Sequence, residues 1–319
     1  MREFRKDPVR GRWTIIATER TGRPTDFKKA PAESPEVRPC PFCEDTAGPV
    51  RVLTLEPARF SGSQAAPGAA DGIYHSQAGL VRHEVIVETP RHGVFLDALD
   101  PDQIARVVDA YVERLSEIER EKGVRYPFLF KNQFVPRSGD GKIVRHSHSE
   151  IYALPVVPKK VEEETTACRD FYLKSGSCLF CRMLAHELSH RRRTVEENEG
   201  FAALVPYAAQ SPFEIVLLPK AHGASFTELA GASRASFGRI LSGVLKKLAR
   251  VLRQRPFYLA LHTLPVPGPE PQIAARESYH WHVEISPRTY FFAGFEWGGG
   301  IFINTAAPEE SARTLREAI

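Results

Sequence analysis

The chain has 319 residues, of which 42% are hydrophobic and 26% charged, and its formal net charge is +4. These values are typical of a globular protein long enough for two domains of about 150 residues each. They argue against a membrane protein, because no apolar run of about 18 residues exists. So mild a charge also argues against nucleic acid as a partner.

The first residues contain no apolar stretch of the signal-peptide type, so we expect a cytoplasmic protein. Four of the five cysteines form two Cys-x-x-Cys pairs, Cys40/Cys43 and Cys178/Cys181, and Cys168 is left over. In a reducing compartment such pairs favour metal binding or redox chemistry over structural disulfides.

The segment after the first cysteine pair predicts a strand, a long helix and two more strands. Residues 85–87 are a short aliphatic run of the kind found in buried strands. Asp100 supplies an N-cap, a proline follows it, and apolar residues recur at three- and four-residue spacing toward Gly123, which predicts one long helix. Strands are then expected at 126–130 and at the histidine-rich segment 146–150.

The same order of features recurs about 130 to 140 residues further on. The second cysteine pair is followed by an aliphatic strand at 215–218, a helix with apolar residues from 237 to 252, a strand at 255–259 and a second His-x-His segment at 280–282. A glutamate stands eight residues before a histidine in both copies, at Glu84 and at Glu214. The chain is therefore expected to be a duplication of one unit.

Each copy is expected to form an α+β unit with a mostly antiparallel sheet and one long helix, because strands precede and follow each helix. We place the units at 1–158 and 165–319, joined by the charged stretch 159–164. The length of the chain then reflects duplication rather than two unlike domains.

Both copies contain the residue types that bind zinc. Two thiolates from one tight turn, together with imidazoles, make the tetrahedral site that zinc prefers. The alternative is a redox dithiol, or buried cysteines beside core histidines. We expect two zinc ions per chain, with iron as an option in the second site. The expected ligands are Cys40, Cys43, His92 and His146 in the first copy and Cys178, Cys181, His222 and His280 in the second.

The second histidine of each His-x-His segment, His148 or His282, is then free of metal. A neutral imidazole, with an ordinary pKa of about 6.5, is a competent nucleophile toward phosphorus. Around the first copy alone the sequence supplies further polar and basic side chains for a substrate, namely Asn132, Lys142, Arg145, Arg20 and Arg23. His148 is therefore the candidate catalytic residue, and a strand histidine with a structural role is the alternative.

These residues resemble the galactose-1-phosphate uridylyltransferase family, a branch of the histidine-triad superfamily. The resemblance covers nearly the whole chain, with motifs in the family's order at Arg5–Ile16, Arg20, Arg23-Pro24, Cys40–Cys43, His92, His146–His148, Pro219–His222, Gly294–Glu296 and Pro308–Glu310. The His-Ser-His-Ser form is closer to the ADP-glucose phosphorylase-like branch than to the His-Pro-His form of the galactose enzymes. That branch also has the second Cys-x-x-Cys.

The resemblance implies two histidine-triad-like domains and a nucleotidyltransferase of the hexose-1-phosphate uridylyltransferase type, which acts in galactose metabolism. By this resemblance His148 attacks the α-phosphorus of a nucleotide sugar, expels the sugar 1-phosphate and forms a nucleotidyl-histidine. A second phosphate-bearing acceptor then takes the nucleotidyl group, so one displacement becomes two. The family also implies a homodimer. The substrate contacts that it implies are Arg20, Arg23, Asn132, Ser147 and Glu150.

Three positions depart from the family's pattern, all at expected substrate contacts. Glu150 replaces a glutamine whose amide donates to a phosphoryl oxygen, Ile143 replaces a serine, and Thr54–Ala58 replaces an Asn-x-aromatic-Pro-Ala segment. An ionised carboxylate cannot donate and repels phosphate unless it is protonated or paired with a cation. The expected metal ligands are intact.

The departures keep other activities open. Within enzymes, the alternative is a phosphorylase or hydrolase of nucleotide sugars or dinucleoside polyphosphates, which differs in whether phosphate, water or a sugar phosphate attacks the intermediate. Outside enzymes, the alternative is a non-catalytic zinc-containing nucleotide-binding protein. A zinc-finger-like nucleic-acid binder is disfavoured by the mild charge and by histidines spread over a hundred residues.

Overall fold

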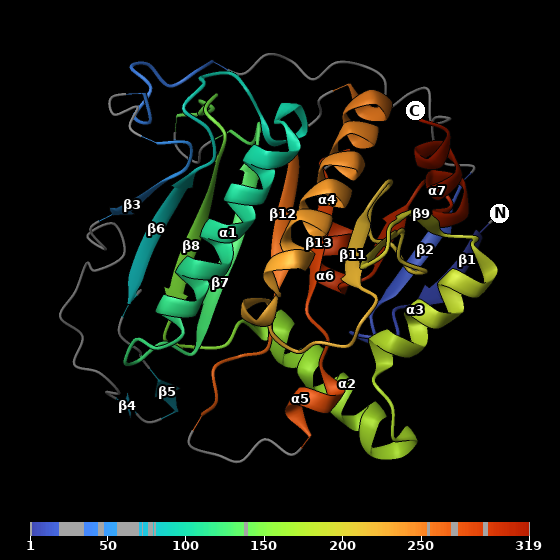
Figure 1. Cartoon of the computed structure of the whole chain (residues 1–319). Helices are drawn as coiled ribbons and strands as arrows, with labels where there is room; N and C mark the ends of the chain where they lie inside the picture. The colour runs from blue at the N-terminus through green and yellow to red at the C-terminus, as the bar shows by residue number, and fades with distance from the viewer. Residues whose placement is uncertain are drawn as a thin grey trace.

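The computed structural model describes residues 2–18, 35–43, 48–55, 70–71, 73–75, 79, 81–136, 140–253, 256–268, 274–289 and 293–318. A single large sheet runs through the molecule (Figure 1). Its strands in chain order are β3 (Arg51–Leu55), β6 (Arg82–Val87), β7 (Tyr126–Gln133), β8 (His148–Leu154), β9 (Thr194–Glu197), β10 (Phe201–Leu204), β11 (Ile215–Pro219), β12 (Phe257–His262) and β13 (His282–Pro287).

The order of these strands in space shows the duplication. The nine-stranded sheet has the order β3-β6-β8-β7-β12-β13-β11-β10-β9, and every pair of neighbours is antiparallel. The half β3-β6-β8-β7 has the same connectivity as β10-β11-β13-β12, and the halves meet at β7 and β12. Each His-x-His segment thus leads into the third strand of its own half, and the α+β antiparallel prediction is confirmed.

The two long helices cover one face of the sheet (Figure 1). They are α1 (Pro101–Ile118) and α4 (Gly231–Leu252). Asp100 caps α1 by accepting a hydrogen bond from the Gln103 backbone N–H at 2.8 Å, as its sequence predicts. The helix ends at Ile118 rather than at Gly123, because residues 119–123 form turns in which Gly123 has φ +91°. The side chains of Asn132, His148 and Glu150 lie on the opposite face of the sheet.

The charged stretch 159–164 is the start of a helix rather than an extended connection. Helix α2 spans Lys159–Ser175, and helix α3 spans Leu179–His190. Val161 and Glu164 are 1% and 0% exposed, so the charged first turn of α2 has a buried side. Six residues are too few for a helical pattern of apolar positions to predict that side from the sequence. The unit boundaries 1–158 and 165–319 stay a prediction.

The first strands lie against the second half of the chain (Figure 1). A three-stranded sheet joins β1 (Arg2–Lys6) and β2 (Trp13–Ala17) to β14 (Phe302–Asn304), and β2 is parallel to β14. Arg5 also donates to Glu309 at 3.0 Å. The remaining elements are β4 (Ala70–Asp71), β5 (Tyr74–His75), α5 (Ala275–Ser278), α6 (Gly294–Gly299), α7 (Pro308–Glu317) and the 3-10 turns Leu96–Ala98 and Phe226–Glu228. No helix in the described part of the chain is both long and apolar enough to span a bilayer.

Candidate active site and metal centres

The first group of predicted metal ligands comes together before strand β8. The backbone N–H of Val37 donates to the Ile143 carbonyl at 2.9 Å, which holds the segment of the first cysteine pair beside the first His-x-His segment. The ligand atoms of Cys40, Cys43, His92 and His146 all lie within 4.8 Å of one another. These residues are far apart in sequence, and it was the recurrence of the same ligand types in both copies that predicted their proximity.

The spacing within this group suits a tetrahedral ion. The Cys43 Sγ lies 3.3 Å from the Nδ1 of His92 and 3.5 Å from that of His146. Tetrahedral zinc with bonds of about 2.0–2.3 Å places neighbouring ligand atoms about 3.3–3.8 Å apart. The outer nitrogens have partners typical of metal-binding imidazoles: His146 Nε2 contacts the Thr89 carbonyl and His92 Nε2 contacts Glu36, both at 2.7 Å.

The second group repeats this arrangement. The Cys181 Sγ is 3.4 Å from the Nδ1 of both His222 and His280, and Cys178 completes the group within 4.8 Å. The hydrogen bond with Cys181 lowers the pKa of the Cys178 thiol, which favours the thiolate form that binds zinc. The outer nitrogen of His280 contacts the Pro219 carbonyl at 3.1 Å. Both groups can therefore hold a metal ion.

The imidazole of His148 is oriented by the backbone of His146, the predicted metal ligand two residues before it. Its Nδ1 lies 2.7 Å from the His146 carbonyl, so this nitrogen donates its proton there and Nε2 is the unprotonated one. The Phe42 ring packs beside it with a centroid separation of 4.9 Å. Burial and the nearby Lys131 ammonium lower the pKa of His148. The side chain is thus a neutral imidazole with Nε2 as a potential nucleophile.

A buried polar network lies behind this histidine. The Lys131 ammonium donates to the His148 carbonyl at 2.8 Å, to Ser147 Oγ at 3.1 Å and to Glu88 at 2.7 Å. Tyr111 also donates to Glu88, at 2.6 Å. Lys131 is only 2% exposed and Glu88 is fully buried, and the ammonium lowers the pKa of Glu88. The network fixes the backbone of the His-x-His segment from the helix-covered side.

Lys131, Glu88 and Tyr111 were not among the residues predicted for the site. A signal for Lys131 was available, because it alternates with Phe130 and Asn132 and therefore shares the face of the buried Leu129. Ser147, predicted to bind substrate, belongs to this network: it is 1% exposed, and its hydroxyl donates to Glu88. It points away from the face that His148 occupies.

Two other predicted substrate residues do share the face of His148. Glu150 follows two residues along β8 and stands opposite Phe130 of β7 in the register of the sheet. Asn132 lies two residues beyond Phe130, so it projects from the neighbouring strand on the same side. Arg20 and Arg23 lie outside the described residues, as does most of Thr54–Ala58.

Glu150 is paired with an imidazole. The Nε2 of His83, on strand β6, is 2.9 Å from a carboxylate oxygen of Glu150. His83 is 6% exposed, and the Tyr152 ring packs on it at a centroid separation of 4.6 Å. His83 can donate its Nε2–H to this carboxylate, the kind of partner that a carboxylate facing a phosphate would need. The sequence offered no signal for it, since 67 residues separate the partners.

A third group of potential ligands lies in the second half, where Glu164, His262 and His282 place ligand atoms within 4.8 Å. His262 Nδ1 is 2.8 Å from Glu164, and burial lowers the pKa of His282 to about 4. The Arg10 guanidinium already donates to Glu164 at 2.6 Å and also to Glu284. A cation therefore balances these carboxylates without a metal ion.

Comparison with known proteins places these sites in a family context. Residues 164–288 match the C-terminal domain of galactose-1-phosphate uridyl transferase. An ADP-glucose phosphorylase of Arabidopsis thaliana is 32% identical over 99% of this chain and 92% of its own. A galactose-1-phosphate uridylyltransferase of Thermotoga maritima is 28% identical over 99% and 98%. The crystal structure of an Arabidopsis thaliana ADP-glucose phosphorylase with bound ADP-glucose superposes with a TM-score of 0.79 at 28% identity, covering 100% of both chains.

Proposed function

The chain belongs to the galactose-1-phosphate uridylyltransferase family of the histidine-triad superfamily, and we propose that it transfers a nucleoside monophosphate from a nucleotide sugar through His148. The observation that supports this most is the contact between His148 Nδ1 and the His146 carbonyl at 2.7 Å. It leaves Nε2 as the free nucleophilic nitrogen, beside a group suited to zinc.

In the first step, His148 Nε2 attacks the α-phosphorus and a P–N bond forms. The bond from that phosphorus to the oxygen bridging the β-phosphate breaks, and its electrons leave with the sugar 1-phosphate. The imidazole becomes cationic, and its Nδ1–H remains bonded to the His146 carbonyl, which stabilises that charge. Lys131 fixes the carbonyl of His148 from behind, so the ring need not reorient during the reaction.

In the second step, an oxygen of the acceptor phosphate attacks the same phosphorus and the P–N bond breaks. We assign Asn132 to a hydrogen bond with a phosphoryl oxygen and Arg20 and Arg23 to the nucleotide phosphates, where planar guanidinium groups bind bidentately. The pair of His83 and Glu150 reduces the repulsion between the carboxylate and the substrate. Ser147 then acts only through the buried network.

We propose zinc in both Cys/His groups, with iron as an alternative in the second. A zinc ion with four protein ligands is structural and supplies rigidity rather than an open coordination position. Cys40, Cys43, His92 and His146 would hold the first ion, and this fixes the backbone carbonyl that orients His148.

Intact-mass spectrometry tests the first step. The full-length protein incubated with ADP-glucose or UDP-glucose should gain the mass of one nucleoside monophosphate. His148→Ala should show no adduct, whereas His186→Ala, an exposed histidine on α3, should form it normally. Binding of these donors without adduct or turnover would identify a non-catalytic nucleotide-binding protein instead.

The compound that accepts the nucleotidyl group from His148 distinguishes a phosphorylase from a uridylyltransferase. The likeness to an ADP-glucose phosphorylase favours inorganic phosphate as the acceptor over a hexose 1-phosphate, the acceptor of a uridylyltransferase. Adding each compound to the preformed adduct distinguishes them: release of ADP by phosphate identifies a phosphorylase, and release of a nucleotide sugar by galactose 1-phosphate identifies a uridylyltransferase. Release at the same rate in plain buffer identifies a hydrolase.

We also propose a homodimer. Helix α6 exposes Trp297 by 89% and Phe295 by 50%, which is unusual for large aromatic side chains on a monomer and supports an interface there. Light scattering should give twice the chain mass, and Trp297→Ser should shift the protein toward the monomer. A wild-type monomer at micromolar concentration would contradict the proposal.

A further inference from the structure

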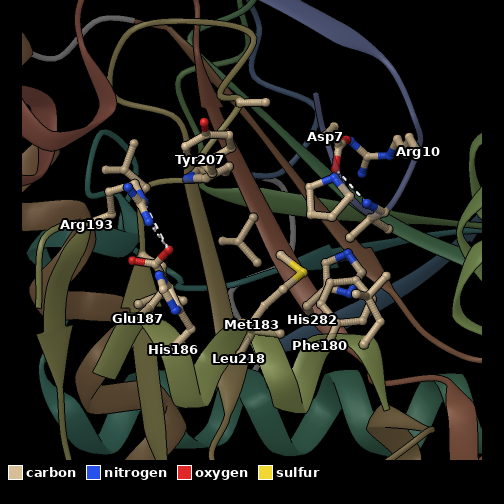
Figure 2. Close-up of a pocket in the computed structure, with 18 of the residues that line it drawn as sticks. Asp7, Arg10, Phe180, Met183, His186, Glu187, Arg193, Tyr207, Leu218 and His282 are labelled. Carbon is tan, nitrogen blue, oxygen red and sulfur yellow. Dashed lines mark hydrogen bonds and ion pairs between the residues drawn. The ribbon is translucent and has the colours of Figure 1, made fainter. Parts of the chain in front are cut away.

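A large cavity lies in the second half of the molecule, away from His148. It has a volume of about 550 Å³, which is within the usual range for small-molecule sites. The cavity is bounded by the N-terminal segment Lys6–Arg10, by α3 and by the face of β10, β11 and β13 that is turned away from α1 and α4 (Figure 2). Its position gives it no part in the reaction proposed for His148.

The cavity is the duplicated counterpart of the surroundings of His148. His282 lines it, and its Nδ1 contacts the His280 carbonyl at 3.1 Å, as His148 Nδ1 contacts that of His146. Phe180 of the second cysteine pair packs on His282 at a centroid separation of 4.6 Å, the place that Phe42 takes beside His148. The two halves thus share one local architecture.

The polar groups of the cavity include a carboxylate oxygen in need of a donor. Glu187 is 8% exposed, and its Oε1 accepts two hydrogen bonds from Arg193, at 2.9 and 2.5 Å. Its Oε2 is buried and has no partner among the described residues. Figure 2 shows Glu187 and Arg193 at one side of the cavity and His282 and Phe180 at the other, with Met183 between them. A ligand hydroxyl or N–H group would satisfy this oxygen.

The charges around the cavity disfavour phosphate. Its two buried guanidinium groups already have carboxylate partners: Arg10 pairs with Glu164 and Glu284, and Arg193 with Glu187 and Glu309. Glu214 is a further carboxyl group in the lining, 7% exposed. The remaining cations, Lys6 and Arg182, are exposed and so belong to its rim.

We propose that this cavity is a second binding site, which takes a nucleoside without phosphates. The base would pack among Phe180, Met183 and Leu218, and a ribose hydroxyl would donate to Glu187 Oε2, as ribose hydroxyls do to the acidic residue of dinucleotide sites. The choice of a nucleoside rests on the proposed function, because it takes the nucleotide site of the duplicated half as its guide.

Calorimetry with the full-length protein tests this, with adenosine and uridine as probes and excess ADP and UDP present to fill the site at His148. We expect saturable binding of at least one nucleoside under these conditions. Met183→Trp fills the cavity and should weaken that binding at least about tenfold, and Glu187→Gln should weaken it severalfold. Leu173→Trp, which adds the same ring to an exposed position outside the lining, should leave it unchanged.

Three results would overturn the proposal: no saturable nucleoside binding at millimolar concentration, binding that Met183→Trp leaves unchanged, or nucleoside binding in plain buffer that excess ADP and UDP abolish. The proposed function is judged separately, because neither Met183→Trp nor Glu187→Gln should affect the nucleotidyl adduct at His148. An absent adduct with intact nucleoside binding would reject the function and keep the second site.

Discussion

The imidazole of His83 and the carboxylate of Glu150 lie 2.9 Å apart on neighbouring strands, two residues along β8 from His148. A glutamate thus takes the position where relatives are expected to have a neutral amide, and a buried histidine accompanies it. In the proposed reaction, this pair would set the charge next to the phosphorus that His148 attacks.

Glu150→Gln removes a negative charge from this position and adds an amide that can donate to a phosphoryl oxygen. We expect kcat/KM for the nucleotide-sugar donor to rise by about tenfold, which corresponds to roughly 1.4 kcal/mol of transition-state stabilisation. Steady-state kinetics at pH 7 measure this. Glu117→Gln, on the exposed side of α1, is the control, and unchanged kinetics in Glu150→Gln would place the carboxylate out of reach of the phosphate.

Lys131→Met leaves the carboxylate of Glu88 buried without its counter-charge. Breaking a buried ion pair in this way costs about 3–5 kcal/mol of unfolding free energy. The double variant Lys131→Met/Glu88→Gln should recover part of that loss, because no charge is then left unpaired. Urea denaturation measures both. Lys159→Met, which breaks the exposed pair with Glu162, should cost less than about 1 kcal/mol, and a similar cost for Lys131→Met would refute the network's role.

Glu214 makes stability depend on pH. Burial raises its pKa to about 7, whereas in the unfolded chain it titrates near 4.5. The charged form is thus disfavoured in the folded state. The contribution of Glu214 to the unfolding free energy is therefore complete below pH 4.5 and is lost as the pH rises through 7. Glu214→Gln should raise the unfolding free energy at pH 8 by about 3 kcal/mol and change it little at pH 4.5.

Urea denaturation at the two pH values measures this difference. Gln210 and Ser211 donate their backbone N–H groups to Glu214, and a glutamine oxygen can accept both, so the variant changes only the charge. The exposed substitution Glu162→Gln serves as the control. The same change in stability at pH 4.5 and pH 8 would show that the ionisation of Glu214 is not the cause.

The two metal groups should be separable. Cys43→Ser and Cys181→Ser should each lower the zinc content from two ions per chain to one, measured by mass spectrometry of the metal. Only Cys43→Ser should impair adduct formation, because β8 and β13 are three strand spacings apart, about 14 Å. Well under one zinc ion in the purified wild-type protein would reject zinc, and equal loss of adduct in both variants would reject their independence.

The repeat and the ligand chemistry made much of the site predictable. Zinc's preference for thiolates and imidazoles, together with their recurrence in the same order in both copies, indicated that Cys40 and His146 belong to one group. The pairing of β7 with β12 could not be predicted, because the backbone N–H and C=O groups at a strand edge are the same whatever the sequence. From the sequence, a charged residue such as Glu164 is predicted to be exposed. Its burial depends on Arg10 and His262, which are remote in the chain.

The parallel pairing of β2 with β14 places Thr14 beside Phe302, so segments near opposite ends of this sequence close one small sheet. During synthesis, β2 cannot acquire its parallel neighbour until residues 302–304 have left the ribosome. Contacts of such long range form slowly. The segment Lys6–Arg10, which forms one wall of the cavity near His282, would therefore reach its place among the last steps of folding.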